Sequence, residues 1–258
     1  MAKNRPSEMP FLDHLEELRW RIVWSLAALG VGVLIGFFLV SRYDIIGLLE
    51  RPIQPYLPNH ILVYTHPVDT FSITIQVAIV FGLTIASPVI LYQIWLFLAP
   101  ALHPQEKKVV IPVIISGVLL FIIGVALAFF FVLPISFKFL QNFQTKSLSP
   151  MITASDYFGF ISTLCLIFGA TFELPLAIAA LTAVGLVNPQ FLTKYRRHSV
   201  VLCWAAAAVI TPGDFLGTTM ALAIPMYLLY EVSIVVSFAI YRRKERRRAE
   251  LIGEEAAT

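Results

Sequence analysis

Residues 22–241 form a nearly continuous series of uncharged apolar runs, which constrains the fold more than any other feature of the chain. Of its 258 residues, 58% are hydrophobic and only 14% are charged. A soluble domain of this size needs a charged surface that this composition cannot supply. The sequence therefore predicts an integral membrane protein.

Six of the apolar runs are candidate membrane spans. A helix of roughly 20 apolar residues crosses the bilayer core, and it satisfies its own backbone hydrogen bonds where lipid offers no partner. The runs lack the strict alternation of apolar and polar residues expected of a membrane β-barrel. We therefore expect an all-α integral membrane protein with six transmembrane helices, at residues 22–40, 71–102, 109–137, 157–187, 199–213 and 215–230.

The distribution of Lys and Arg predicts the orientation. Six spans place both termini on one side, and this side receives 15 of the 19 basic residues. The positive-inside rule then puts both termini in the cytoplasm. We expect a single membrane domain over residues 1–258, with a cytoplasmic amphipathic helix (1–21), a six-span core (22–241) and a basic cytoplasmic tail (242–258). The tail is expected to anchor the topology and contact anionic lipid, with no role in binding nucleic acid.

Five prolines lie inside or near the ends of the spans and predict kinks, because proline removes one helix hydrogen bond. Several kinked helices side by side favour a curved wall. The last two runs are short: fifteen residues reach about 22 Å, against a bilayer core of about 30 Å. We expect the bilayer to be thinner beside them. The proline-rich outer loop 41–69 is expected to form short helical pieces and turns. The five prolines are Pro88, Pro112, Pro134, Pro175 and Pro225.

An acidic site precedes the first span. An apolar stripe at helical spacing predicts an interfacial amphipathic helix here, and Glu17 and Arg21, four residues apart, can pair on it. One interpretation is a solvated helix face with routine i,i+4 support. The other is a cation-binding surface.

A second acid, Glu106, follows Pro104 and suits the first turn of a helix. A carboxylate at the membrane surface is also a strong receptor for a guanidinium group, and spacing alone does not choose between these.

Glu173 is the one acid inside the central apolar run. Water cannot solvate a carboxylate at this depth, so we expect it to be neutral, paired or set in a wet cavity. The structural alternative is a neutral acid bonded locally to Thr171 or Thr163. Asp214, in the turn between the last two runs, is most simply the N-cap of the final helix.

No enzyme signature stands out. The chain lacks the HExxH, GxSxG and P-loop patterns, its five His residues are scattered, and its two Cys residues have no metal-ligand spacing. We expect no metal site, no cofactor and no catalytic activity. Gly32 and Gly36 form a GxxxG pattern in the first span, which could serve helix packing within the chain or contact between copies.

Several motifs in fixed order resemble the TatC family, the multispanning receptors of the twin-arginine protein translocase. The resemblance covers nearly the whole chain. The motifs are residues 14–21 (HLEELRWR), 87–102 (SPVILYQIWLFLAPAL), Glu106, 172–175 (FELP), 211–214 (TPGD) and 223–227 (AIPMY).

This resemblance implies a concave, glove-like arrangement of six helices in a prokaryotic cytoplasmic membrane. It implies binding of signal peptides with two adjacent arginines on folded cargo, and transport driven by the proton-motive force. The implied partners are the single-span subunits TatA and TatB, docking at the last two spans, and further copies of the chain. The implied signal-peptide site comprises Glu17, Arg19, Arg21, Phe97 and Glu106, with Pro52 and Asp214 in support and Glu173 facing the concave side.

Two other classes remain open at this stage. A proton-coupled carrier of small molecules could use Glu173 as its relay, although the sequence shows no second titratable group at that depth. A purely structural membrane scaffold is the third reading. A comparison of twin-arginine and twin-lysine peptides would distinguish a signal-peptide receptor from both alternatives. A receptor should lose binding with the twin-lysine peptide, because Lys keeps the charge without the fork of donors.

Overall fold

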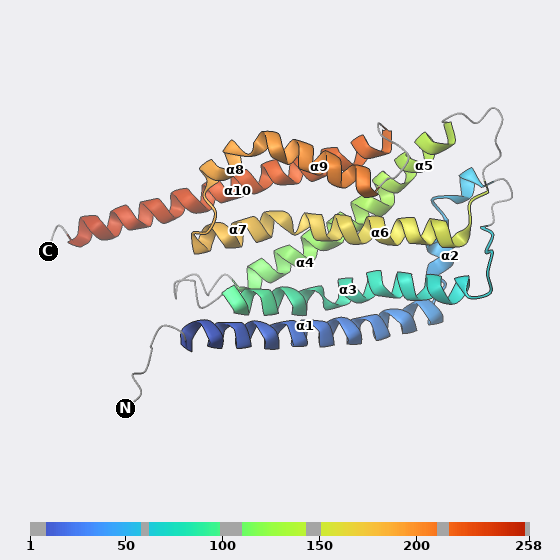
Figure 1. Cartoon of the computed structure of the whole chain (residues 1–258), viewed down its shortest axis with the longest axis horizontal. Coiled ribbons are helices and arrows are strands. Elements are labelled where there is room, and N and C mark those ends of the chain that lie inside the picture. Colours follow the sequence, from blue (N-terminus) through green and yellow to red (C-terminus); the bar gives the residue numbers. More distant parts are fainter. Residues whose placement is uncertain (1–8, 58–61, 99–109, 143–150, 211–216, 256–258) are drawn as a thin grey trace.

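The computed structural model describes residues 9–57, 62–98, 110–142, 151–210 and 217–255. These residues form an all-α fold in which the chain runs back and forth between two ends (Figure 1). In chain order, the passes are α1 (Met9–Arg42), α3 (Asp69–Leu98), α4 (Val110–Leu127) continued by η4 (Ala128–Val132) and α5 (Leu133–Asn142), α6 (Ala154–Phe172) continued by α7 (Leu174–Val184), α9 (Arg196–Ile210), and α10 (Gly217–Glu255).

The passes form a layer. α1 packs mainly on α3, α3 packs on α4 and α6, and α10 joins α7 to α9. The start of α1 and the end of α10 lie at the same end, on the left in Figure 1.

Five helical passes are long and apolar enough to cross a bilayer within the described part of the chain. The exception is α9, whose 15 residues reach about 22 Å. α9 is therefore as short as the sequence indicated. The expectation for the last pass was wrong, because α10 runs for 39 residues through the basic segment instead of ending near residue 230. Apolar residues resume after Glu231, so the candidate span itself covers Thr219–Arg246, and the Arg and Glu residues beyond it are good helix formers.

Prolines shape two of the passes. Pro134 is the second residue of α5 and follows the π-helical turn η4, where the missing amide disturbs the regular ladder. Pro175 follows the break between α6 and α7. Pro88 and Pro225 lie inside continuous helices.

The outer loop forms the short helices α2 (Ile45–Glu50) and η1 (Gln54–Tyr56), as the proline-rich sequence predicted. It is fixed to the start of α6, because the Tyr157 hydroxyl donates a 2.5 Å hydrogen bond to the Leu49 carbonyl. Ile53, next to Pro52, is fully buried. The loop is thus a packed cap at one end of the layer.

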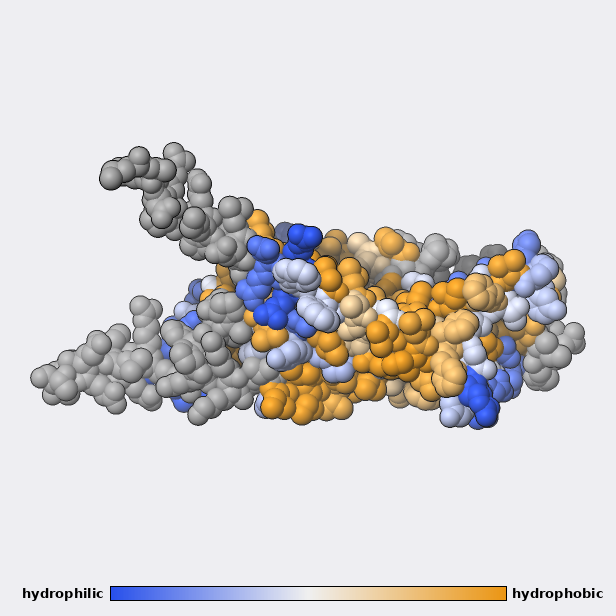
Figure 2. Space-filling model, turned by 90° about the horizontal axis from the view of Figure 1, so that it is seen from below, coloured by the Kyte–Doolittle hydropathy of each residue, from blue (hydrophilic) through white to orange (hydrophobic). Residues whose placement is uncertain are grey.

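Many large apolar side chains are exposed, as expected of a surface solvated by lipid. Figure 2 shows polar residues gathered toward the two ends of the visible face, with an apolar band between them. The apolar and polar zones fit a multi-pass membrane protein.

The GxxxG face of α1 packs within the chain. A Cβ on Gly36 would lie 2.6 Å from the Ala78 carbonyl oxygen, and a Cβ on Gly32 would collide with the Gly82 carbonyl. A Cβ on Gly82 would lie 2.6 Å from the Val33 backbone. The glycines of both helices therefore let the α1 and α3 backbones approach closely.

We expect Gly82→Ala to destabilise the protein by about 1–3 kcal/mol, because the new methyl group meets rigid backbone on α1. The measurement is the thermal unfolding midpoint of the purified protein in detergent. Gly30→Ala is the matched control, since a Cβ there meets nothing within 4 Å. Equal midpoints for both variants would contradict this packing.

Candidate functional site

Glu17 and Arg21 lie near the start of α1 and form the pair that their spacing predicted. Arg21 Nη2 donates a 2.9 Å hydrogen bond to Glu17 Oε1. Arg21 Nη1 donates a second hydrogen bond, 3.2 Å long, to Gln93 Oε1 on α3. The guanidinium group therefore connects a carboxylate on α1 to an amide on α3. The Glu17 and Arg21 side chains are 34% and 27% exposed, so the pair lies at the surface of the layer.

The pairing of α1 with α3 brings Phe97 to the same place. The helices are antiparallel, and Gly36 meets Ala78, Gly32 meets Gly82 and Arg21 meets Gln93. Continued by one helical turn, this register puts Glu17 level with Phe97. Gln93 and Phe97 are four residues apart, so they share one face of α3. The structure therefore brings together three of the predicted site residues: Glu17, Arg21 and Phe97.

The other predicted residues of this surface are placed differently. Arg19 is exposed on α1 and is not a member of the Glu17–Arg21 pair. Glu106 and Asp214 lie outside the described residues, so their roles remain predictions. Pro52 lies in the outer cap, at the opposite end of the layer from Glu17 (Figure 1). It does not contact the Glu17 surface, and it can support it only through the packing of the whole layer.

Glu173 stands at the break between α6 and α7. Both of its carboxyl oxygens are buried without a hydrogen-bond partner among the described residues. Gly117 of α4 makes the space for the group: a Cβ on Gly117 would lie 3.2 Å from Glu173 Oε2, and the Leu91 and Leu176 side chains border the same point. The alternative of a local bond to Thr171 is not observed, and the Thr171 hydroxyl donates instead to the Ile167 carbonyl at 2.7 Å. An unpaired acid in this environment is far cheaper to keep neutral than charged.

Sequence reasoning missed two residues of these sites. Gln93 anchors Arg21, and Gly117 opens the space for Glu173. Gln93 had a detectable signal, because it is an amide in an otherwise apolar stretch. Gly117 had none, because many membrane helices contain glycine.

A third polar cluster joins α9 to α10. Arg196 Nη2 donates to Glu231 Oε2 at 2.8 Å, and the Tyr227 hydroxyl donates to Glu231 Oε1 at 2.6 Å. The Tyr230 hydroxyl donates to the Leu192 carbonyl of α8 (Pro189–Lys194) at 2.7 Å. Glu231 therefore fixes the start of α9 against α10.

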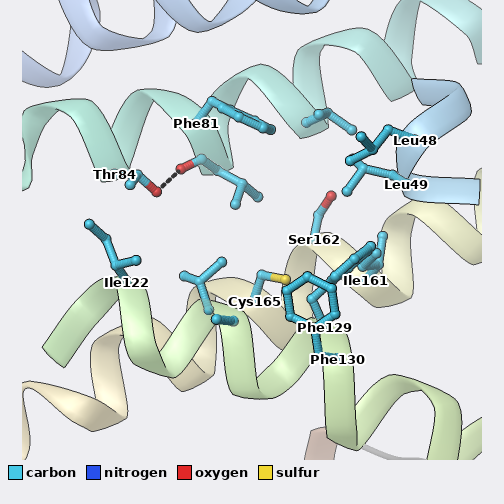
Figure 3. Close-up of a pocket in the computed structure, with 14 residues that line it drawn as sticks. Leu48, Leu49, Phe81, Thr84, Ile122, Phe129, Phe130, Ile161, Ser162 and Cys165 are labelled. Carbon is cyan, nitrogen blue, oxygen red and sulfur yellow. Dashed lines mark hydrogen bonds between the residues drawn. The ribbon is translucent and has the colours of Figure 1, made fainter. Parts of the chain in front are cut away.

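An apolar cavity of about 270 Å³ lies between α2, α3, α4 and α6 (Figure 3). No charged side chain lines it, and the Thr84 hydroxyl on its wall is already bonded to the Val80 carbonyl at 2.8 Å. Glu173 is not part of its wall. The cavity thus gives no support to a carrier for polar solutes. A metal site is also not indicated, since the described residues contain no cluster of three or more candidate ligands.

Comparison with known proteins identifies the family. The family model for the Sec-independent protein translocase protein TatC matches residues 13–225. The TatC protein of Koribacter versatilis is 37% identical over 246 residues, covering 94% of this chain and 90% of that protein. The TatC protein of Aquifex aeolicus is 35% identical over 244 residues, covering 93% of this chain and 100% of that protein.

A solved structure agrees with this match. A crystal structure described as the twin-arginine translocase receptor TatC superposes with a TM-score of 0.77 at 34% identity, covering 88% of this chain and 99% of that one. The expectation that the chain is not an enzyme is confirmed at the level of the family, whose members are translocase components. The chain therefore belongs to the TatC family of Sec-independent protein translocase subunits.

Proposed function

We propose that this subunit binds twin-arginine signal peptides at the end of the layer where α1 starts, and that this end faces the cytoplasm. The observation that carries the proposal is the 2.9 Å hydrogen bond from the Arg21 guanidinium to the Glu17 carboxylate. It shows Glu17 held at the surface in an orientation that accepts a guanidinium group. The similar solved structure is described as a twin-arginine translocase receptor, which supports the proposal.

The chemistry of the surface suits a pair of arginines. A guanidinium group can donate two parallel hydrogen bonds to one carboxylate, so two adjacent arginines call for two acids. Glu17 is one, and Glu106 is the proposed second. Phe97 offers a ring on which a guanidinium plane can stack. Arg19 would lie beside the site and affect which charges the peptide can carry next to its arginine pair.

Glu173 is the proposed polar contact within the membrane. A signal hairpin or partner helix with a polar side chain needs a hydrogen-bonding group at depth, because unpaired polar groups are costly in lipid. Glu173 is such a group, and its carboxyl oxygens have no partner among the described residues. In this proposal the acid is neutral at rest and bonds to the helix that arrives during transport.

The partners we propose are the single-span subunits TatA and TatB, docking at α9 and α10, together with further copies of this chain. α9 supports this, because it is short and its Val201, Leu202 and Val209 side chains are 68%, 71% and 82% exposed. The complex would act in the cytoplasmic membrane of a prokaryote, with both termini in the cytoplasm, and draw on the proton-motive force. No nucleotide or other cofactor is required by this scheme.

Peptide binding tests the proposal directly. We expect the purified protein in lipid nanodiscs to bind a labelled twin-arginine signal peptide and to bind its twin-lysine version at least roughly tenfold more weakly, because Lys lacks the planar fork of donors. Fluorescence anisotropy at fixed salt gives both affinities. Equal affinities for the two peptides would mean that charge attraction alone explains binding. That result would overturn recognition by paired hydrogen bonds.

A further inference from the structure

Arg21 links two helices through the two ends of one rigid group. Its Nη2 reaches Glu17 Oε1 at 2.9 Å and its Nη1 reaches Gln93 Oε1 at 3.2 Å. Gln93 is half-buried on α3, while Glu17 and Arg21 lie on α1. The α1–α3 pairing thus ends in a polar relay, Gln93–Arg21–Glu17, next to the turn that carries Phe97.

We propose that Gln93 is a positioning residue for signal-peptide recognition: through Arg21, it fixes the orientation in which Glu17 meets the peptide. This inference rests on the proposed function and assigns that site a residue outside the acid pair. Gln93 itself need not touch the peptide. Its amide oxygen holds the guanidinium, and the guanidinium holds the carboxylate.

The i,i+4 pair alone is too weak for this task. A partly exposed Glu–Arg pair on one helix contributes little to stability, and both side chains are long and rotatable. A second anchor on a different helix restricts the guanidinium to one place. The planar group of Arg can reach both acceptors in a fixed geometry, whereas a Lys ammonium is a point donor on a flexible stem.

The hydrogen bond from Arg21 fixes one of the two oxygens of the Glu17 carboxylate. Arg21 Nη2 donates to Oε1, and an ionised carboxylate offers about four lone-pair sites for donors. Arg21 Nε makes no hydrogen bond to any described residue. In this proposal Arg21 stays bound to the Glu17 carboxylate, and the arginine of the peptide binds beside it. Glu17 already accepts a hydrogen bond from a guanidinium group.

Gln93 also sits where an amide is costly without a purpose. It lies in an apolar stretch near the end of a membrane-spanning helix, on the same face as Phe97 and in register with the Glu17 region. An amide in an apolar environment carries a desolvation penalty unless it forms a hydrogen bond. The hydrogen bond from Arg21 gives the Gln93 amide oxygen a partner, and it accounts for the position of both groups.

The test is a double-mutant cycle on peptide affinity in nanodiscs. Gln93→Met keeps the length and removes the acceptor, and Arg21→Lys keeps the charge and removes the fork. We expect each to weaken binding of a labelled twin-arginine peptide roughly tenfold, with the double variant no weaker than the worse single variant. Gln93→Glu, which restores an acceptor, should recover most of the affinity.

Gln76→Met is the matched control. Gln76 lies on the same helix, and its amide oxygen has no partner among the described residues. It should bind the peptide like the unmodified protein. Gln93→Asn, whose shorter amide no longer reaches Arg21, guards against misfolding of Gln93→Met, and the thermal midpoint of each variant confirms its fold.

The outcomes separate the two proposals. If the unmodified protein does not bind the peptide, the proposed function is wrong. If it binds and the folded Gln93 variants bind equally well, the positioning role is wrong. If the losses from Gln93→Met and Arg21→Lys add up in the double variant, Gln93 acts independently of Arg21, which also overturns the relay.

Discussion

Glu17→Lys is expected to reduce binding of a twin-arginine peptide by roughly a hundredfold or more, to the background of nonspecific adsorption. The change removes the carboxylate and sets a cation against both Arg21 and the arriving arginines. Like charges facing each other across an interface cost several kcal/mol, and each 1.4 kcal/mol is a factor of ten in affinity. Anisotropy titration of the labelled peptide against the variant in nanodiscs measures this loss.

Glu16→Lys is the control for this experiment. It makes the same change in net charge on the neighbouring position of α1, but Glu16 is exposed and about 100° around the helix from Glu17. We expect at most a few-fold loss of peptide affinity for this control. Added salt should make the loss smaller still, because it screens exposed charges. Comparable losses for both variants would show that the overall charge of the surface matters and the Glu17 geometry does not.

Glu106→Lys extends the same test to the proposed second acid. If two carboxylates receive two guanidinium groups, reversal at either position should abolish binding. Normal crosslinking of the peptide to Glu106→Lys would remove Glu106 from the site. Glu17 would then be the sole acid supported by geometry.

Glu173→Ala is expected to reduce transport of a folded, tagged cargo at least roughly tenfold while leaving peptide binding at the surface within a few-fold of normal. The reason is location: Glu173 is buried at the α6–α7 break, whereas Glu17 is at the surface near the start of α1. Loss of a hydrogen bond to a partner at depth costs about 1–3 kcal/mol, the penalty of the group left unpaired. Uptake of cargo into membrane vesicles, alongside the anisotropy titration, measures both quantities.

Glu173→Gln distinguishes the neutral acid from a proton relay. Gln is a neutral group of the same size that donates and accepts hydrogen bonds, so it should retain much of the transport if the acid acts in its neutral form. A carrier that moves protons through this position would fail with Gln as completely as with Ala. Full transport by Glu173→Ala would show that the buried acid is dispensable.

The local features of this chain were predictable because they depend on residues close together in sequence. Hydropathy over about 20 residues predicted the membrane passes and the short α9, and the spacing of Glu17 and Arg21 predicted their pair. The expectation about α10 was wrong because the run was ended before the single charge at Glu231, whereas the apolar residues resume beyond it and the candidate span covers Thr219–Arg246.

What the sequence alone determined is the class of molecule: a helical membrane protein whose ordered motifs resemble one translocase family. The tertiary structure decided which side chains meet. It set the α1–α3 register that brings Gln93 to Arg21, assigned the Gly32 and Gly36 face to packing within the chain, and enclosed Glu173 beside Gly117. Helical periodicity specifies the face on which a residue lies, but the partner of that face depends on how distant helices align along their lengths.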